Sequence, residues 1–141
     1  MNPTPKDWPR LSSALFYDDA AAAIDWICRA FDFKIRIKID GENGAIAHSE
    51  LEYGEALIMV SGASAEKRHA SPRSCQGANT QSLFLYVDDV DAHCERARAA
   101  GAKILSEPTV SDYGEGHWAD RNYEVEDLEG HRWCFAQRVR G

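Results

Sequence analysis

The chain has 141 residues, 44% of them hydrophobic, a length and composition typical of a single domain with its own core. The formal net charge of -7 and the pI near 5.2 argue against nucleic acid as a partner, because a phosphate backbone requires a basic surface. No run of about 18 apolar residues is present, and the first residues lack the apolar centre of a signal peptide. We therefore expect a cytoplasmic protein with no membrane partner and with four reduced, widely spaced cysteines.

The first half of the chain is predicted to contain one strand, one helix and three further strands. Residues 11–17 are rich in strand-forming residues, and Asp18 and Asp19 then offer an N-cap to an alanine-rich run. That run carries a single apolar stripe at helical spacing, formed by Ile24, Ile27, Cys28 and Phe31. The helix is therefore expected to pack on one side only. The strands that follow are predicted at residues 34–40, 45–52 and 56–61.

A polar segment, residues 63–81, is predicted to be a surface connector, because Gly, Ser, Ala and Pro occur in it without periodicity. After it the same order of elements restarts. A strand at 82–87 leads to a helix that is capped by Asp88 and Asp89 and ended by Gly101. The strands that complete this half are predicted at residues 103–107, 121–126 and 131–137.

The spacing of matching features indicates an internal repeat. The pair Asp18-Asp19 recurs as Asp88-Asp89, 70 positions later, and the turn glycine Gly54 recurs as Gly130, 76 positions later. We therefore predict one domain over residues 1–141, built from two βαβββ modules at about 11–62 and 82–138, with an insertion at 106–118. The fold class is α+β, in which two curved, mainly antiparallel sheets surround a cleft and the helices cover the outer face.

Two stretches within these modules carry a resemblance to a known family. AHSELEYGEALIMVSG at 47–62 and YGEGHWADRNYEVEDLEGHRWCF at 113–135 resemble the vicinal oxygen chelate superfamily, also called glyoxalase/bleomycin resistance/dioxygenase. They look most like its PhnB-like or glyoxalase-like branch, and the second stretch ends in the pattern D-x-x-G-x-x-x-x-F. The resemblance implies a pocket enclosed by a curved sheet, a homodimer and, in the enzymes, a divalent metal held by His, Gln or Glu.

The resemblance also implies that the metal ligands of the enzymes lie on the first and last strand of each module. In this chain those positions fall on Ser12, Ile58, Ser82 and Cys134. A divalent metal that acts as a Lewis acid needs three or more converging N, O or thiolate donors, and these residues do not supply them. We therefore expect no metal and no cofactor there, and we expect Cys134 to be a packed, unreactive thiol.

Other residues are candidates for holding a ligand. His48 and Glu50 lie two apart on a predicted strand and so point to one face, either toward a polar ligand group or toward solvent. Tyr113 and Trp118 stand close to Arg121 in sequence, which suits a flat ligand with a carboxylate or a carbonyl. The alternative is that Trp118 anchors a dimer or covers the core.

The predicted floor of the cleft supports binding more than hydrolysis. Phe84 is one of the inward-facing strand residues, which are mainly apolar with scattered hydroxyls. These observations favour a metal-independent protein of the bleomycin-resistance type that binds a small molecule and forms a homodimer. The alternative is a divalent-metal-dependent, glyoxalase-like lyase or isomerase, or a ring-cleaving dioxygenase, with its ligands at other positions. A third hypothesis is a dimeric interaction module.

Overall fold

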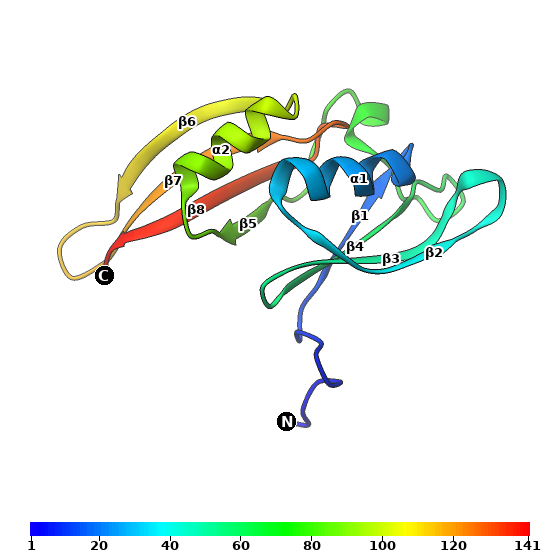
Figure 1. Cartoon of the computed structure of the whole chain (residues 1–141), viewed down its shortest axis with the longest axis horizontal. Helices are drawn as coiled ribbons and strands as arrows, with labels where there is room; N and C mark the ends of the chain where they lie inside the picture. Colours follow the sequence, from blue (N-terminus) through cyan, green and yellow to red (C-terminus); the bar gives the residue numbers. More distant parts are fainter.

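The computed structural model describes all 141 residues and contains two four-stranded sheets and two α-helices (Figure 1). The first module consists of β1 (Ser13–Tyr17), α1 (Ala20–Phe31), β2 (Lys34–Asp40), β3 (Ile46–Tyr53) and β4 (Ala56–Gly62). The second consists of β5 (Leu83–Tyr86), α2 (Val90–Ala99), β6 (Lys103–Asp112), β7 (Ala119–Glu126) and β8 (Arg132–Arg140). Short 3-10 helices are η1 (Glu42–Gly44) and η2 (Pro72–Cys75). The predicted α+β class with two βαβββ modules is confirmed.

The two sheets repeat one topology, with strand orders β1-β4-β3-β2 and β5-β8-β7-β6. In each sheet the first strand lies parallel to the last strand of its module, and the other neighbours are antiparallel. Ala14 of β1 lies opposite Met59 of β4, and Phe84 of β5 lies opposite Cys134 of β8. Within one chain the two sheets do not close around a cleft, and each keeps one face free of helices (Figure 1).

Side-chain capping fixes where both helices begin. The Asp19 carboxylate accepts a hydrogen bond from Ala22 N, and the Asp89 carboxylate accepts one from Ala92 N, at 3.0 Å in each case. These contacts satisfy backbone N–H groups that have no partner inside the helix. The caps predicted from the sequence are therefore confirmed. Neither helix combines the length and the apolar character that crossing a membrane requires.

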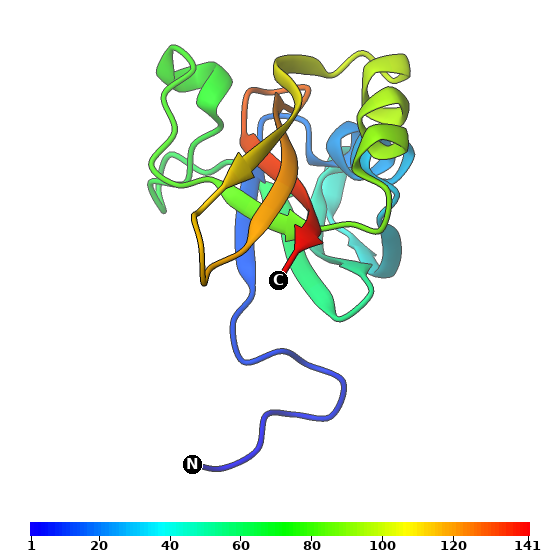
Figure 2. The ribbon, with the colours of Figure 1, turned by 90° about the vertical axis from the view of Figure 1, so that its left-hand side faces the viewer.

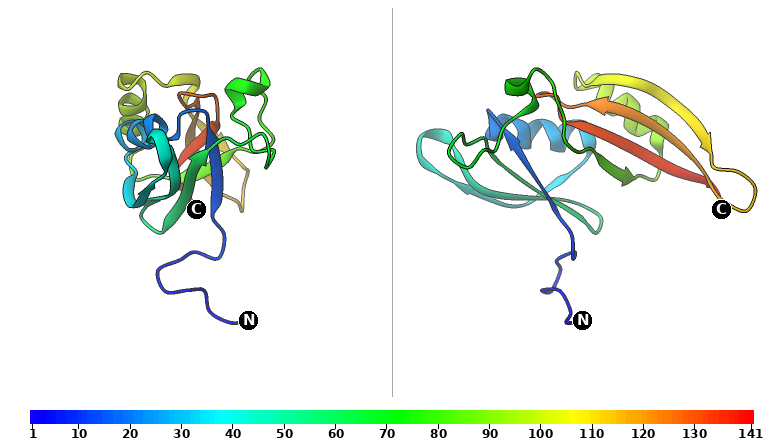
Figure 3. Two further views of the ribbon diagram at one scale, coloured as in Figure 1. Left: turned by 90° about the vertical axis from the view of Figure 1, so that its right-hand side faces the viewer. Right: turned by 180° about the vertical axis from the view of Figure 1, so that it is seen from behind.

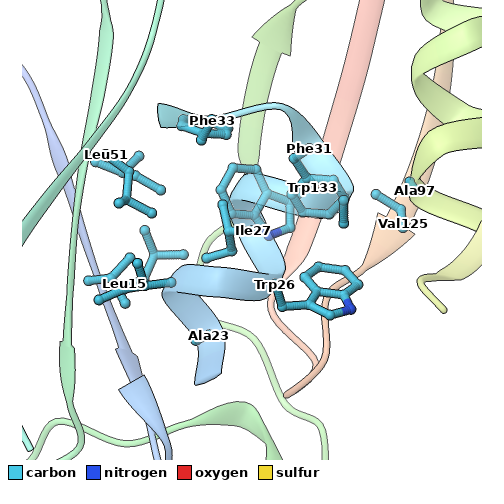
Figure 4. Packing of buried hydrophobic residues seen from close by; sticks show 14 of the residues in the cluster. Leu15, Ala23, Trp26, Ile27, Phe31, Phe33, Leu51, Ala97, Val125 and Trp133 are labelled. Atoms are coloured by element: carbon cyan, nitrogen blue, oxygen red, sulfur yellow. The ribbon is translucent and has the colours of Figure 1, made fainter. Parts of the chain in front are cut away.

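Both helices pack on the same side of the two sheets and cover a shared core (Figure 2). Figure 4 shows Phe31 and Trp133 in the middle of this core, between Leu51 of the first sheet and Val125 of the second. The ring centroids of Phe31 and Trp133 are 5.0 Å apart. Burial of a large apolar side chain contributes about 1.5–3 kcal/mol, so this layer holds the modules together. We call the side of each sheet that bears no helix its open face.

Polar contacts also join the modules, at the turn that precedes β8. Tyr17 donates its hydroxyl hydrogen to Asp127 Oδ2 at 2.6 Å. The Glu129 carboxylate accepts hydrogen bonds from the backbone N atoms of Asp18 and Asp19, at 2.7 and 2.9 Å. The acidic turn of the second module therefore fastens the end of β1 and the approach to α1 in the first.

The connector, residues 63–81, lies on the side of the molecule opposite the helices (Figures 2 and 3). Its first residue, Ala63, donates its backbone N–H to Tyr17 O at 2.8 Å. Near its other end, Asn79 Nδ2 donates to Gly130 O at 2.9 Å. The connector is thus attached to both modules and covers part of the open side.

The predicted insertion at 106–118 is mostly a continuation of a strand. β6 extends to Asp112, and its pairing with β7 continues as far as Ala119. Two register shifts interrupt this pairing, one before and one after Ser106. Only the hairpin loop 113–118 lies outside the ladder, so the second sheet is longer than the first rather than interrupted.

Candidate functional site

The open face of the second sheet carries exposed aromatic side chains. Phe84 and Tyr86 alternate along β5 with Leu85, which packs against the core. Because Phe84 pairs with Cys134, both side chains stand on the open face. The exposed fractions of Phe84 and Tyr86 are 53% and 46%, which is unusual for large aromatic residues. Their rings are in contact, with centroids 5.2 Å apart.

Arg138 extends this aromatic surface along β8. Its guanidinium carbon lies 5.2 Å from the ring centroid of Tyr86 and 5.3 Å from that of Trp118, within the range of cation–π attraction. Arg138 Nε donates to Asp120 Oδ1 at 2.6 Å, and Tyr86 donates its hydroxyl hydrogen to Asp120 Oδ2 at 2.9 Å. The Asp120 carboxylate raises the pKa of the Arg138 guanidinium. A buried carboxylate thus fixes a cation between two exposed rings.

The loop 113–118 completes the cluster. The ring centroids of Tyr113 and Trp118 lie 5.5 Å apart, and the exposed fraction of Trp118 is 42%. Phe84, Tyr113 and Trp118 were all predicted from the sequence as ligand contacts, and the structure places them on one continuous surface. We call the following set the aromatic cluster: Phe84, Tyr86, Tyr113, Trp118 and Arg138.

Arg121 lies away from the aromatic cluster. Its guanidinium donates two hydrogen bonds to the Asp91 carboxylate of α2, at 2.8 and 2.9 Å. In the β7–β8 ladder Arg121 pairs with Gln137, and Gln137 accepts a hydrogen bond from Val90 N at the start of α2. Arg121 therefore faces the helix layer. The cation beside Trp118 is instead Arg138. Arg138 lies four residues after Cys134 on β8, so its side chain points to the same open face. This alternation along the strand was the signal available in the sequence.

His48 and Glu50 lie on the open face of the other sheet. His48 Nε2 and Glu50 Oε2 are hydrogen-bonded at 2.7 Å, and Arg36 Nε lies 3.5 Å from Glu50 Oε1. Glu50 is buried by these partners, while the neighbouring Ile37 and Ile39 are exposed by 42% and 50%. The predicted ligand residues therefore form two groups on different sheets, and a single chain does not bring them together.

A hollow of about 530 Å³ lies between the first strands of the two modules. Three of the four positions implied as metal ligands, Ser12, Ile58 and Ser82, are among the residues that line it. The strand register changes one of these assignments. Ala14 of β1 pairs with Met59, and its counterpart in the second module, Phe84 of β5, pairs with Cys134, so Met59 is the counterpart of Cys134. Ile58 is instead buried toward the core. The implied position on β4 is therefore corrected from Ile58 to Met59.

The donor chemistry at these positions does not fit a divalent metal. Ser12, Met59 and Ser82 offer two hydroxyls and a thioether, which are weak ligands for such ions. Burial, followed by the charges of Glu124 and Asp120, raises the pKa of the Cys134 thiol to about 11, so the thiolate is scarce at neutral pH. No group of three or more His, Cys, Asp and Glu side chains in the chain is arranged to hold a metal ion.

The chain matches one known family model, and it is also similar to known proteins and to solved structures. The family model of the glyoxalase/bleomycin resistance protein/dioxygenase superfamily matches residues 11–135. An uncharacterized protein of Mycobacterium bovis is 33% identical over 135 residues, which cover 94% of this chain and 85% of that protein. An uncharacterized protein of Mycobacterium tuberculosis (strain H37Rv) has the same identity, over 94% of this chain and 76% of its own length.

Solved structures share the fold. TioX from Micromonospora sp. ML1 is 32% identical, with a TM-score of 0.70, and the match covers 93% of this chain and 99% of TioX. TnmS3 from Streptomyces sp. CB03234, described as an antibiotic binding protein, is 18% identical with a TM-score of 0.65, covering 91% of this chain and 93% of TnmS3. At that identity the likeness to TnmS3 concerns the fold alone.

Proposed function

Because the chain belongs to the glyoxalase/bleomycin resistance protein/dioxygenase superfamily, we propose that it is a metal-independent protein that binds a small, flat, partly apolar molecule. The observation that carries this proposal is the aromatic cluster, in which Arg138 is held between the exposed rings of Tyr86 and Trp118. Exposed aromatic rings around a fixed cation provide surfaces for stacking and one polar anchor. The description of TnmS3 as an antibiotic binding protein supports the same class of function on this fold.

The proposed site is completed by a second copy of the chain. Both open faces expose apolar side chains, Ile37 and Ile39 on the first sheet and Phe84 on the second, and such surfaces favour association. In the proposed homodimer the first sheet of one protomer covers the second sheet of its partner. His48 and Glu50 of one protomer would then orient polar groups of a ligand that stacks on the aromatic cluster of the other.

Two measurements test this function. Elemental analysis of the purified protein without a histidine tag is expected to find no stoichiometric divalent metal. Tightly held Zn, Ni, Mn or Fe at one equivalent per chain would instead support the alternative, a metal-dependent lyase, isomerase or dioxygenase. In the second measurement, a panel of planar aromatic compounds is titrated while tryptophan fluorescence is followed.

The Trp118→Ala variant provides the matched comparison for the titration. Loss of one stacking ring is expected to weaken binding of a hit compound by about tenfold or more. The Glu95→Ala variant is the control, because Glu95 is exposed on α2, on the helix-covered side of the sheet and away from both open faces. Equal affinity of wild type and Trp118→Ala for every hit would remove the aromatic cluster from the binding site.

A further inference from the structure

A second hollow, of about 500 Å³, lies between the connector and the open face of β1. We call it the connector hollow. The polar and aromatic side chains that matter for its chemistry are Phe16, Arg68, His69, Asn79 and His131. None of the residues that line it is Asp or Glu, although the chain as a whole carries a formal net charge of -7. The connector hollow thus combines one arginine with several hydrogen-bonding groups, and no carboxylate lines it.

A short hairpin holds Arg68 and His69 at this hollow. The backbone groups of Ser64 and His69 exchange two hydrogen bonds, at 2.8 and 2.9 Å. Arg68 adopts a φ of 58°, in the left-handed region that a non-glycine residue adopts only under constraint. Its guanidinium makes no salt bridge and no hydrogen bond within the chain, whereas nearby Arg73 pairs with Asp18 and Glu129. The backbone of Arg68 is therefore held at the hollow, and its exposed guanidinium carries a charge without a partner in the chain.

The two histidines keep ring nitrogens free for a ligand. The His69 ring stacks on Phe16 with centroids 3.8 Å apart and an angle of 17° between the planes, and neither of its nitrogens has a hydrogen-bond partner. His131 Nε2 donates to Phe16 O at 2.8 Å, since a carbonyl oxygen only accepts. The other nitrogen of the neutral ring, Nδ1 of His131, is then an acceptor without a partner in the chain, so the free donor of the pair is on His69. Stacking thus fixes the plane of His69 and leaves its edge available.

We propose that the connector hollow binds an oxyanion, the carboxylate or phosphate group of a small molecule. An arginine without a carboxylate partner forms charge-assisted hydrogen bonds to such groups, and the unpaired ring edge of His69 adds one N–H donor. No carboxylate lines the hollow, and the neighbouring Asp127, which accepts a hydrogen bond from His131 N at 3.0 Å, is engaged by the Tyr17 and Trp133 donors of the core, which reduces its repulsion of an anion. This inference is independent of ligand binding at the aromatic cluster, because it involves different side chains and another strand.

The test is an NMR titration of the full-length protein, with the imidazole signals of His69 and His131 as the readout. The probes are inorganic phosphate and benzoate, each at constant pH and ionic strength with chloride as the balancing ion. Benzamide is the neutral counterpart of benzoate. We expect saturable shifts of both histidines with at least one anion and none with benzamide. A preference for phosphate or for benzoate identifies which of the two groups the natural ligand carries.

Substitutions locate the binding group. Arg68→Gln is expected to weaken anion binding by about fivefold or more, because it removes the only full charge of the hollow. His69→Phe keeps the stacking on Phe16, removes the imidazole edge and is expected to weaken binding as followed at His131. Lys67→Gln is the matched control, an equal change of charge on the same hairpin outside the lining.

Three outcomes would overturn the proposal. The first is a linear, non-saturating response to both anions, and the second is equal binding of benzamide and benzoate. The third is an equal loss of affinity in Lys67→Gln and Arg68→Gln. It would mean that anion binding depends only on the total positive charge of the hairpin and not on the position of Arg68.

Discussion

Tyr17 of the first module donates its hydroxyl hydrogen to Asp127 of the second, across 110 positions of sequence and at 2.6 Å. Trp133 Nε1 donates to the same carboxylate oxygen at 3.1 Å. Burial raises the pKa of Asp127, and these two donors act against that rise by stabilising the carboxylate. The contact explains why an acidic turn stands before β8, since that turn is a polar link between the two modules.

Replacing Tyr17 by Phe is expected to destabilise the fold by about 1–3 kcal/mol, because a buried carboxylate loses one of its donors. The free energy of unfolding in urea measures this. Tyr113→Phe serves as the control, since the Tyr113 side chain is exposed by 51% and its substitution should stay within about 0.5 kcal/mol of wild type. Equal stability of the two variants would show that the Tyr17 contact contributes nothing.

Stability is expected to fall as the pH decreases below about 6.5, because of His93. Tyr123 donates its hydroxyl hydrogen to His93 Nδ1 at 2.6 Å, and Nε2 donates to Phe31 O at 3.0 Å, so the neutral ring is fully paired. Burial lowers the pKa of His93, so the unfolded chain takes up a proton at higher pH than the folded chain does. Each pH unit between the two pKa values costs up to about 1.4 kcal/mol.

Urea unfolding at pH 8 and at pH 5.5 checks the contribution of His93. His93→Gln should be less stable than wild type at pH 8 but should lose less stability on acidification. His117→Gln, at an exposed position of the loop 113–118, should follow the wild-type profile. An unchanged slope in His93→Gln would assign the acid sensitivity to other groups.

Alkylation by iodoacetamide is expected to distinguish the cysteines. Cys75 is exposed in the connector, whereas Cys134 has a pKa raised to about 11 and holds little thiolate at pH 8. Mass spectrometry of the native protein should therefore show rapid labelling of Cys75, and labelling of Cys134 that accelerates with pH well beyond 8. In Cys75→Ser the fast phase should disappear. A fast phase at Cys134 would instead identify it as an activated thiol.

Introducing a charge on the open face of the first sheet is expected to weaken the proposed homodimer. Ile37→Glu places a carboxylate on the surface that we propose covers the partner's second sheet, and burying an unpaired charge there is costly. Analytical ultracentrifugation should show a dissociation constant raised by about tenfold or more. Ile35→Glu is the control, since a register shift lies between Ile35 and Ile37, and Ile35 pairs with Leu51 of the helix-covered face. A monomeric wild-type protein would contradict the proposed assembly.

Much of the fold followed from the sequence, because local signals repeat in both modules. The aspartate caps, the single apolar stripe of α1 and the recurring order of elements each have a local physical cause. The register of β4 against β1 was not predicted correctly from the sequence. The turn around Gly54 joins Tyr53 and Ala56 directly, whereas the loop around Gly130 runs from Glu126 to Arg132. Aligning the two glycines therefore shifted the strand by one residue and assigned Ile58 in place of Met59.

The candidate site was predicted less well, because nearness in sequence does not decide which face of a sheet a side chain occupies. Arg121 lies three positions from Trp118 in sequence, yet it turns toward Asp91 of α2. Arg138 lies 20 positions from Trp118, and the pairing of β7 with β8 brings it over the ring. Strand pairing is a long-range property, and the sequence alone did not specify it.

The link between Tyr17 and the turn before β8 also constrains how the chain acquires its structure. Glu129 is made 111 and 110 residues after Asp18 and Asp19, the two residues ahead of α1 whose backbone N–H groups it binds. During synthesis the backbone N–H groups at the end of β1 therefore lack these partners until nearly the whole chain has been made. Closure of such distant contacts is slow compared with helix formation. The two modules are thus repeats in pattern but a single cooperative unit in folding, and we expect neither to be stable when expressed alone.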